Sequence, residues 1–548
     1  MNNSASSSTL ERASTTLIAR SEDTPSFVIG NANKSYKYQY SNIYYMRLQC
    51  LRECVLERAE RKWKDLDGDP VLVDRVLEVE KGQLCYIIGT VYLDMPLKPN
   101  VLEDIARDRS ILPPAPPPKF CSEGDIISLE DESGRINLVG EHLKKIQLVT
   151  GIVIGALGIE TPGGEFEVAD ICLPGLAPQP SLPDPPTMDV DGKARLRRTD
   201  TLLTRHLDAL QPEWVALVSG FDIGTTSSLS DILIHMLVEY LTCEGGGPGD
   251  QLEASRISRL IIAGNSLAPL DLGPQVENIS LDDKKGKRNG NEPSPFSPHP
   301  IQTLSGYLLD ITQVMPVHIL PGSNDPSGSI LPQQPFPRAM LGSATSMPWF
   351  SCETNPTYIH LETGSGEDED EESTASLSAR PVPRKFLVNS GQPLNDLFKY
   401  LESPPHTRLS ILESTLKWRH MAPTAPDTLW CHPYFSADPF IIQETPDIYV
   451  VGCQKRFGTR LVSEDDDDDA GSRKCRIIMV PNFSETGILV LVDMKTLAVK
   501  TIKFMAKGAD RRTPNGSQHP SSSTQEVSQA DSSLSALSSS AHPDTQRG

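Results

Sequence analysis

One repeated pattern in the second half of the sequence restricts the fold more than any other: a short apolar run followed at once by a glycine-containing loop. The runs WVALVSG, SRLIIAG, PVHILPG and DIYVVG begin at residues 214, 258, 316 and 447. Unbroken runs of Val, Ile and Leu are typical of strands buried on both faces. Because helical patterns lie between these runs, we expect residues 213–506 to form a layered α/β domain with mixed sheets.

Four helices are predicted in this region. The first has six apolar side chains on one face, at three- and four-residue steps: Leu229, Ile232, Leu233, Met236, Leu237 and Leu241. The second has a similar stripe of Ile301, Leu304, Leu308 and Ile311. Two shorter helical patterns, PLNDLFKYL and LSILESTLKW, begin at residues 393 and 409. Further strands are predicted at TYIHLE, RKFLVN, RIIMVPN, ILVLVD and LAVKTIKF.

The first half of the chain has a different pattern. Apolar side chains at Tyr45, Leu48, Leu51, Cys54, Val55 and Ala59 predict a helix of about five turns. Short β-branched runs follow, with hairpin turns expected at residues 80–82 and 131–134 and a helix-like stretch from Val101. About five to seven strands predict a small Greek-key barrel, with the oligonucleotide-binding (OB) fold as one candidate. The strands contain few Lys, Arg or aromatic residues, which favours a protein-binding barrel.

Several stretches have compositions that do not support a packed core. Residues 1–35 are predicted to be a disordered start, residues 176–212 a proline-rich linker and residues 507–548 a serine-rich disordered tail. Polar stretches near residues 275–300, 362–382 and 462–474 are predicted to be surface loops of the α/β domain. Basic clusters at residues 193–198 and 284–288 are either nuclear-import signals or solvated linker charge.

The formal net charge of −21 argues against a protein whose main task is to hold nucleic acid, because phosphate binding needs a positive field. The ten cysteines include no CxxC pair, and the N-terminus has no apolar run. Zinc ribbons, a disulfide framework and secretion are therefore not predicted. No apolar stretch approaches the roughly 20 residues that span a bilayer. We expect a soluble protein of the cytosol or nucleus.

The candidate functional site lies in the loops after the predicted strands, because ligands of such sheets bind beyond the carboxyl ends of the strands. These loops are GFDIG, AGNSL, PGSND and GCQKRFG. Metal-dependent hydrolysis of phosphate esters needs several carboxylates and imidazoles that converge from different strand ends. The four loops contain no histidine. We therefore predict no catalytic residue, no metal ligand and no cofactor.

Six longer motifs occur in order along the chain: LVSGFDIG, LIIAGNSL, HILPGSNDP, LVNSGQPLNDL, HPYFSADPFI and YVVGCQKRFGT. With the preceding helix, barrel and proline-rich joint, they resemble the small (B) subunits of DNA polymerase delta over about residues 36–506. The α and ε polymerase small subunits share the domain pair, but the helix that runs directly into the barrel favours delta. The resemblance implies a helix and OB-type barrel, residues 36–175, packed on an inactive calcineurin-like phosphoesterase domain, residues 213–506.

The resemblance also implies where the phosphoesterase residues would lie. The first-strand metal ligands fall on Ser219 and Phe221, the bridging aspartate on Asn265, the Asn-His pair on Ser323 and Asn324, and the last two histidines on Cys453 and Lys455. Only Asp325 keeps its residue type, and in the family pattern it supports the site from behind without binding a metal. Alternatively, Asp325 accepts hydrogen bonds within its own turn.

By the same resemblance, the chain is expected to be a non-catalytic scaffold of polymerase delta in the nucleus, in DNA replication and repair synthesis. Its expected partners are the C-terminal domain of the catalytic subunit and a third, clamp-contacting subunit, with at most weak or indirect contact with DNA. The alternatives are an active phosphoesterase, the small subunit of another replicative polymerase, or a single-strand-binding protein. Exposed aromatic residues are typical of interfaces, and the candidates are Tyr44, Tyr45, Tyr434 and Phe435, with core packing as the alternative for each.

Overall fold

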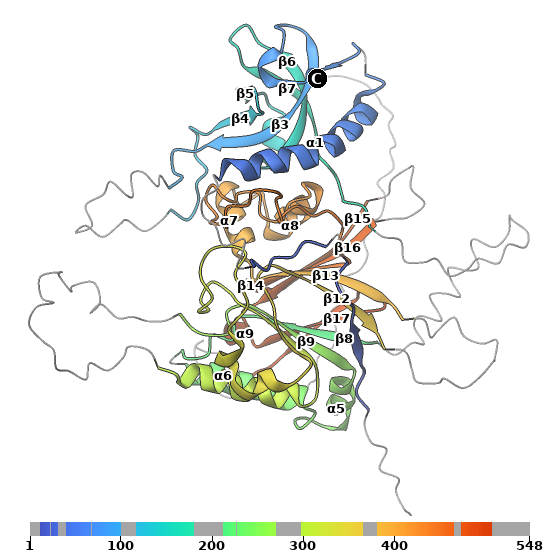
Figure 1. The fold of residues 1–548 in the computed structure, drawn as a ribbon, viewed down its shortest axis with the longest axis vertical. Coiled ribbons are helices and arrows are strands. Elements are labelled where there is room, and N and C mark those ends of the chain that lie inside the picture. Colours follow the sequence, from blue (N-terminus) through green and yellow to red (C-terminus); the bar gives the residue numbers. More distant parts are fainter. Residues whose placement is uncertain are drawn as a thin grey trace, which may run out of the picture. The chain divides into compact units, whose positions relative to one another are not determined.

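The computed structural model describes residues 11–21, 24–30, 40–66, 68–99, 117–179, 212–225, 227–269, 297–364, 381–464 and 473–506. These residues belong to one compact unit that ends at Ala506 (Figure 1). The linker beyond residue 179, most of the three predicted loops, the basic clusters, the helix-like stretch from Val101 and the tail lie outside the described residues. Within the described ranges, no helix combines the length and apolar character needed to cross a membrane.

The first folded block is a helix followed by a closed barrel. Helix α1 spans Ser41–Trp63. The barrel contains β2 (Val71–Leu72), η2 (Val76–Glu78), β3 (Leu84–Asp94), β4 (Ile126–Glu130), β5 (Arg135–Val139), η3 (Leu143–Lys145), β6 (Val153–Glu160) and β7 (Phe166–Cys172). The strand order is β2-β3-β4-β5-β7-β6, and β3 also pairs with β6, which closes the sheet. The predicted barrel is therefore confirmed.

One of the two predicted hairpin turns is present. Strands β4 and β5 pair in antiparallel fashion, and the Asp131 side chain accepts hydrogen bonds from the amides of Ser133 and Gly134 in their turn. The hairpin predicted at residues 80–82 was wrong, because β2 and β3 pair in parallel. Parallel neighbours require a crossover connection, which residues 73–83 form with η2.

Helix α1 buries a stripe that differs from the predicted one. Its buried residues are Ile43, Arg47, Leu48, Leu51, Val55, Ala59 and Trp63. Tyr45 was wrongly predicted to lie on this stripe, since 49% of it is exposed. Three of the buried side chains pack on Ile88 and Val153 of the barrel and on Ile441 of the second domain. The helix therefore lies between the barrel and the second domain.

The second domain contains two six-stranded sheets. The first has the order β11-β10-β9-β8-β17-β18 and the second β1-β12-β13-β14-β16-β15. Their strands are β1 (Thr15–Leu17), β8 (Trp214–Val218), β9 (Ile257–Ala263), β10 (Val317–Leu320), β11 (Phe350–Cys352), β12 (Thr357–Thr363), β13 (Pro383–Asn389), β14 (Ile448–Gln454), β15 (Gly458–Glu464), β16 (Arg473–Pro481), β17 (Ile488–Asp493) and β18 (Val499–Lys503). Leu217 and Ile261 of the first sheet share a core with Phe386 and Val450 of the second, so the sheets pack face to face.

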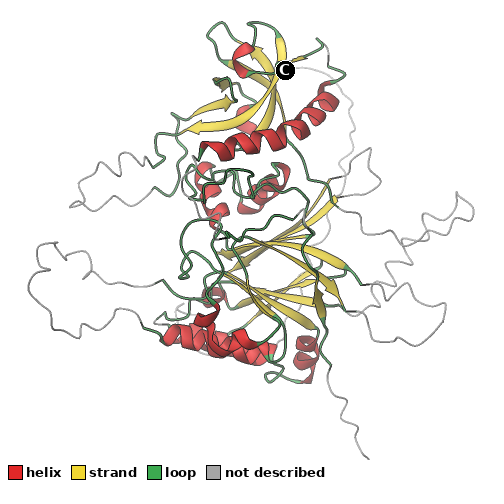
Figure 2. Cartoon of the chain, in the orientation of Figure 1, coloured by secondary structure: helices red, strands yellow, loops and turns green. Residues whose placement is uncertain are grey.

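Helices cover the outer faces of both sheets (Figure 2). The first sheet packs on α4 (Ser228–Leu241), α5 (Pro248–Ser255), α6 (His299–Thr312) and η5 (Arg338–Ser346), and the second on α7 (Gln392–Tyr400) and α8 (Arg408–Lys417), with α9 (Phe483–Thr486) after β16. The predicted stripe of α4 was partly wrong, because Leu229 and Ile232 are 38% and 50% exposed. Ile234 and Val238 are buried in their place.

Two stretches predicted to lack structure are partly ordered. Residues 11–21 and 24–30, within the predicted disordered start, include strand β1, which pairs with β12. Phe27 in the same stretch is fully buried. At the start of the predicted linker, Leu176 and Ala177 are also buried. The prediction of disorder from composition was wrong at these residues, because a few buried side chains anchor otherwise polar segments to the second domain.

A buried ion pair lies at the junction of the α1-barrel block and the second domain. Arg47 Nε donates a hydrogen bond to Asp438 Oδ2 at 2.7 Å, and both side chains are fully buried. His420 Nε2 lies 2.8 Å from the same carboxylate oxygen. We call Arg47, His420 and Asp438 the junction cluster. The remaining Arg47 nitrogens donate to the backbone oxygens of Gly151, Pro423 and Ala425.

The junction cluster contains an ionised pair and a neutral imidazole. Burial alone would raise the pKa of Asp438, but the charge of Arg47 and the hydrogen bonds from His420 and Arg47 hold it well below its usual range. Burial and the charge of Arg47 lower the pKa of His420 to about 4. His420 Nδ1 accepts a hydrogen bond from the Ala422 amide, so the ring proton lies on Nε2, which donates to Asp438.

Candidate functional site

The four loops predicted to form the site meet beyond the ends of β8, β9, β10 and β14. The Gly220 amide donates to the Gly264 oxygen at 2.9 Å, which joins the first loop to the second. The Cys453 amide donates to Ser219 Oγ at 2.8 Å, which joins the fourth loop to the first. The prediction that these loops converge is therefore confirmed, and the arrangement is determined by the parallel order of their strands.

Asp325 connects the second and third loops through its carboxylate. Its Oδ2 accepts from the amides of Gly322 at 2.7 Å and Ser266 at 3.2 Å, and its Oδ1 accepts from Leu267 at 2.9 Å. Burial raises the pKa of Asp325 to about 6, against the effect of these hydrogen bonds. The carboxylate thus bonds within its own turn, through Gly322, and to the neighbouring loop, through Ser266 and Leu267. Its carboxylate oxygens face backbone donors, which leaves them poorly placed for a metal ion.

Asn265 stands where the family pattern has its bridging aspartate, and it also bonds to the protein. Its Oδ1 accepts from the Asn324 amide at 3.1 Å, with the Ser323 hydroxyl 3.4 Å away. Gly322 is required for this approach, because a Cβ there would lie 2.2 Å from Asn265 Oδ1. The loop containing LPGSNDP is therefore shaped by contacts between two neighbouring loops.

The sequence analysis missed Asp222, which lies one residue after Phe221. Asn324 Nδ2 donates to Asp222 Oδ1 at 3.3 Å, and Ser484 Oγ donates to Asp222 Oδ2 at 2.9 Å. Burial raises the pKa of Asp222, and these two hydrogen bonds oppose the rise. Asp222 has a φ of 47°. The motif FDIG contains this residue, but the position has no counterpart among the expected metal ligands, so the family pattern assigns it no role.

Three of the other predicted positions are buried or bonded within the domain. Ser219 is fully buried, and its hydroxyl lies 3.1 Å from the Val480 oxygen. Phe221 is buried and packs edge to face on Phe483, with ring centroids 5.9 Å apart. Burial, with the nearby charges of Asp325 and Asp222, raises the pKa of the Cys453 thiol well above its usual value. The thiol is therefore protonated at neutral pH.

A two-metal hydrolytic centre does not fit these residues. Such a centre needs ionised carboxylates and neutral imidazoles with free lone pairs. The loops instead contain two carboxylates that accept hydrogen bonds from the protein, two amides, two hydroxyls, an aromatic ring and a protonated thiol. Lys455, at the last histidine position, is exposed. Among the described residues, no group of three or more His, Cys, Asp or Glu side chains is placed to hold a metal ion.

The four aromatic interface candidates divide into two kinds. Tyr44 and Tyr434 are half-buried, with Arg47 above the Tyr44 ring at 5.1 Å and Tyr434 packed edge to face on Phe440. Tyr45 and Phe435 are 49% and 58% exposed. Core packing therefore explains the first two, while the second two remain candidates for an interface.

Trp430 is a further exposed aromatic residue that the sequence analysis missed, with 64% of it exposed. It precedes Cys431, whose thiol lies close enough to Tyr44 to affect the pKa of that tyrosine. On the other side, the Asn42 side chain donates to the backbone oxygen of Phe435. We call Tyr45, Trp430 and Phe435 together the aromatic surface. Tyr45 lies near the start of α1, and the other two lie in the loop of residues 427–436, which contacts α1 through Asn42.

Two known families match consecutive parts of the chain. Residues 39–171 match the family described as DNA polymerase delta subunit OB-fold domain. Residues 215–364 and 383–459 match the family of the B subunits of DNA polymerases alpha and epsilon. The first match covers the block of α1 and the barrel, and the second covers most of the two-sheet domain.

Individual relatives match from less than half to most of the chain. A DNA polymerase delta small subunit from Saccharomyces cerevisiae is 33% identical over 499 residues, which cover 86% of this chain and 90% of that protein. A protein of the same name from Arabidopsis thaliana is also 33% identical, over 85% of this chain and 91% of that protein. A DNA polymerase II small subunit from Thermoplasma acidophilum is 22% identical over 44% of this chain and 41% of that protein.

Proposed function

This chain belongs to the family of DNA polymerase delta small subunits, and we propose that it is a non-catalytic member that bridges two other subunits of the polymerase. One is the catalytic subunit, held through its C-terminal domain, and the other is a third, clamp-contacting subunit. The chain is thus an accessory subunit in DNA replication. Because a replicative polymerase works on chromosomal DNA, we propose the nucleus as its compartment.

The observation that carries the non-catalytic proposal is the bonding of Asp325. Its carboxylate accepts hydrogen bonds from three backbone amides and joins two loops. At the neighbouring positions, Phe221 and Ser219 are buried and packed or bonded within the domain. The site that would bind metal in an active phosphoesterase therefore contributes to the stability of the loops.

The aromatic surface supports the bridging proposal. Aromatic residues are enriched at protein interfaces and often dominate their binding free energy. Tyr45 belongs to α1, whereas Trp430 and Phe435 belong to the second domain. A partner that binds there would contact both blocks of the chain at once. We assign this surface to one of the two polymerase partners.

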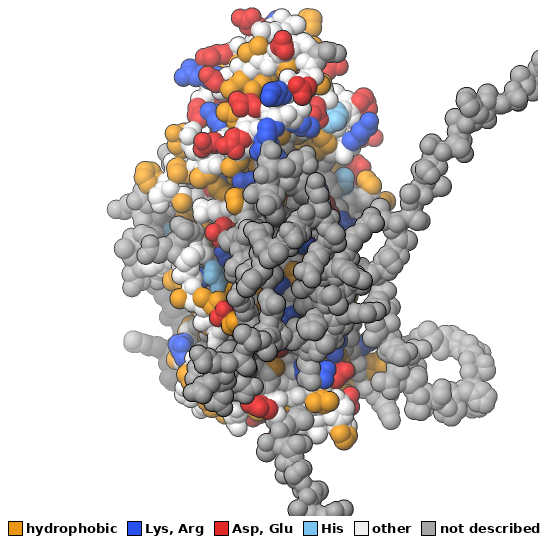
Figure 3. Space-filling model, turned by 90° about the vertical axis from the view of Figure 1, so that its right-hand side faces the viewer, with side chains coloured by type: hydrophobic (Ala, Val, Ile, Leu, Met, Phe, Trp, Pro, Cys, Tyr) orange, Lys and Arg blue, Asp and Glu red, His pale blue; other side chains and the backbone are white. Residues whose placement is uncertain are grey.

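Contact with DNA is proposed to be weak or indirect. On the face shown in Figure 3, Asp and Glu side chains are interspersed with Lys and Arg over the upper end, which carries the barrel in Figure 1. Non-specific DNA binding needs Lys and Arg to neutralise several phosphates along one path. Among the described side chains on this face of the barrel, no such basic path is visible.

The proposal is tested by purifying the tagged chain at its native expression level in mild salt and identifying stoichiometric partners by mass spectrometry. We expect a large polymerase subunit and a smaller clamp-binding subunit. A chain that emerges alone would contradict the bridging function. The triple variant Tyr45→Ala, Trp430→Ala, Phe435→Ala is expected to bind one of the two partners at least about tenfold more weakly. The reason is that each such aromatic anchor commonly contributes more than about 1 kcal/mol to the binding free energy.

A matched control keeps this result specific. Leu229→Ala with Ile232→Ala removes exposed apolar side chains from α4, far along the chain from the aromatic surface. We expect this control to retain both partners. If the aromatic variant folds and also retains both partners, the assignment of this surface is wrong, while the bridging proposal itself stands on the partners recovered.

A further inference from the structure

The N-terminal segment, residues 11–21 and 24–30, is held on the second domain by contacts near its two ends. At the first end, Arg12 donates to the backbone oxygens of Ala254, Ile257 and Leu241 at 2.7–3.0 Å. Leu241 is the last residue of α4, and Ala254 lies in the last turn of α5. Cations are stabilised at helix C-termini, where backbone oxygens lack partners within the helix.

The middle of the segment adds a strand to the edge of a sheet. Thr15, Thr16 and Leu17 pair with Thr363, Glu362 and Leu361 of β12. The Ile18 amide donates to the His360 oxygen at 2.9 Å. Arg259 of β9 donates to Thr15 through both its Nε and Nη2, so the added strand contacts both sheets. This is the geometry by which edge strands recognise extended peptides.

The other end of the segment is anchored by one aromatic ring. Phe27 is fully buried, with its ring stacked on Tyr358 at 5.9 Å and on Phe440 at 6.3 Å. Gln334 bonds the backbone on both sides, since its Nε2 donates to the Phe27 oxygen and its Oε1 accepts from the Ile29 amide. The residues immediately before and after Phe27 are exposed.

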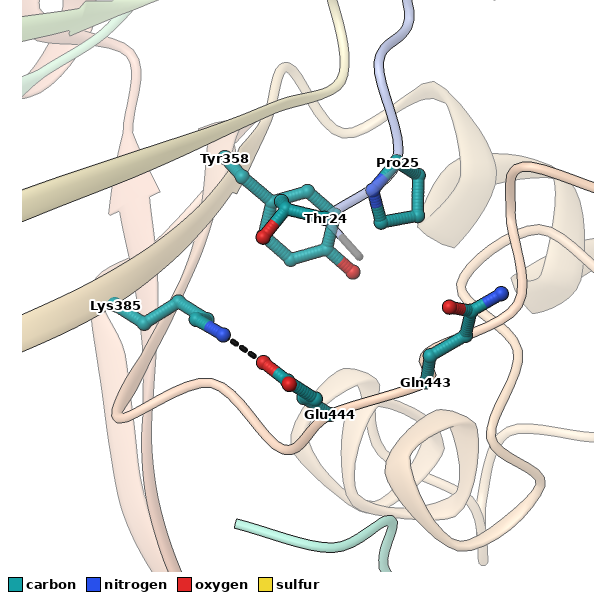
Figure 4. A pocket seen from close by; sticks show the side chains of 6 residues that line it. All are labelled: Thr24, Pro25, Tyr358, Lys385, Gln443 and Glu444. Carbon is teal, nitrogen blue, oxygen red and sulfur yellow. Dashed lines mark hydrogen bonds and ion pairs between the residues drawn. The ribbon is translucent and has the colours of Figure 1, made fainter. Parts of the chain in front are cut away.

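The segment does not fill the groove in which it lies. Figure 4 shows a small hollow between Thr24 and Pro25 of the segment and the side chains of Lys385 and Glu444, which form an ion pair. Tyr358 and Gln443 complete its lining. Core elements interdigitate to crystal-like density. Thr15 and Phe27 are the buried residues of the described segment. A segment with so few buried side chains, exposed neighbours and a hollow beneath it is packed as a bound peptide is packed.

We propose that the β12 edge, with the sockets for Arg12 and Phe27, is a peptide-binding groove that the chain occupies with its own N-terminal segment. The segment leaves the groove while the two sheets stay folded, and the groove binds the same peptide in trans. The ligand is an extended chain with an arginine near its first end, a central β-strand and a buried aromatic ring near its second end. This inference is independent of the function proposed above.

Two measurements on the full chain test the proposal. In hydrogen exchange, amides of residues 14–18 are expected to exchange at least about 100-fold faster than those of β13 and β14, because local opening precedes global unfolding. In the Phe27→Ala chain, protection of residues 14–18 is lost while that of β13 and β14 is unchanged. Val28→Ala is the matched control, and it is expected to behave as the unmodified chain.

The second measurement uses a fluorescent peptide of residues 11–30. We expect saturable binding to the Phe27→Ala chain and little binding to the unmodified chain, whose own segment competes at an effective concentration of about 1 mM. A peptide that itself carries Phe27→Ala is expected to bind about 100-fold more weakly, because it cannot fill the aromatic socket. Absence of peptide binding to the folded variant would overturn the proposal.

A second variant keeps the test decisive if Phe27→Ala does not fold. Ile18→Pro removes the amide that bonds to His360 without removing a buried side chain. It is expected to release the segment and to admit the unmodified peptide. If either variant lowers protection equally across residues 14–18, β13 and β14, the segment is an ordinary part of the fold and the proposal is wrong.

Discussion

The junction cluster and the loops beyond β8, β9 and β10 are both buried and polar, but the pKa values of their carboxylates are shifted in opposite directions. Asp438 faces Arg47 and has a pKa well below its usual range. Asp222 and Asp325 have raised pKa values, and their hydrogen bonds come from amides and a hydroxyl. The carboxylate with the lowered pKa therefore lies where two blocks of the chain meet, paired with an arginine.

The two polar regions therefore differ in the elements that they connect. At the junction, Arg47 links α1 to the second domain and, through the Gly151 oxygen, to the barrel. Gly151 has a φ of +91°, and a Cβ there would lie 2.0 Å from the Pro423 oxygen. The loops beyond the strands bond to one another and to β16 and α9 of the same domain. We interpret the junction as the element that keeps the α1-barrel block and the second domain in one unit.

The largest expected effect is that of Arg47→Ala. It leaves Asp438 as a buried charge with a neutral imidazole as its nearest partner, so we expect a loss of about 3–5 kcal/mol in the free energy of unfolding. The control is Arg52→Ala, which breaks the partly exposed pair with Glu132 and is expected to cost about 0–1 kcal/mol. Denaturant titration of both variants measures the difference. Equal losses of unfolding free energy in the two variants would show that the junction cluster stabilises the protein no more than an exposed ion pair does.

A smaller loss is expected from Asp325→Ala. Three amide donors lose their acceptor, and an unsatisfied buried donor costs about 1–3 kcal/mol. We expect a net loss of about 2–3 kcal/mol in the free energy of unfolding. The loss is limited because the variant also removes the cost of burying the Asp325 carboxylate. Asn324→Ala removes the two long side-chain bonds, to Asp222 and from the Ser323 hydroxyl, and is expected to cost under about 1 kcal/mol. An Asp325→Ala protein as stable as the control would contradict the structural function of this carboxylate.

The two regions are also expected to respond to pH in opposite directions. The pKa of His420 falls from 6.5 to about 4 on folding, so its contribution to stability is lost as the pH falls from 6.5 toward 4. The pKa of Asp325 rises from 3.8 to about 6, so its contribution is gained as the pH falls through 6. We expect His420→Gln to flatten the acid loss of stability and Asp325→Asn to steepen it. The free energy of unfolding of each variant and of the unmodified chain, measured between pH 7 and pH 4, checks both expectations. If the two variants change the pH dependence of stability in the same direction, the assignment of opposite pH responses is wrong.

Much of the fold was accessible from the sequence because buried strands and amphipathic helices leave periodic patterns. The barrel, the two-sheet domain and the convergence of the four loops were predicted. The N-terminal segment was missed because its contacts are made with residues distant in sequence, by Arg12, strand β1 and Phe27, in a stretch whose composition indicates disorder. The parallel pairing of β2 with β3 was missed because the intervening residues resemble a turn.

The site was predicted in part for a related physical reason. The identities at Ser219, Phe221 and Asn265 predicted that these positions are not metal ligands, whereas the hydrogen bonds and packing of their side chains are visible only in three dimensions. Asp222 was missed because its partners, Asn324 and Ser484, are distant in sequence. Arg47 was missed because a buried arginine interrupts the apolar stripe of α1 and carries no pattern of its own.

We propose that the loops of the second domain stabilise the fold and perform no metal-dependent chemistry. The most direct test is manganese-dependent hydrolysis of bis(p-nitrophenyl) phosphate by the purified full chain, with Asp222→Asn measured in parallel. We predict that the unmodified chain and the variant both remain at the rate of the buffer blank. Turnover by the unmodified chain that rises with manganese and is lost in Asp222→Asn would contradict the account.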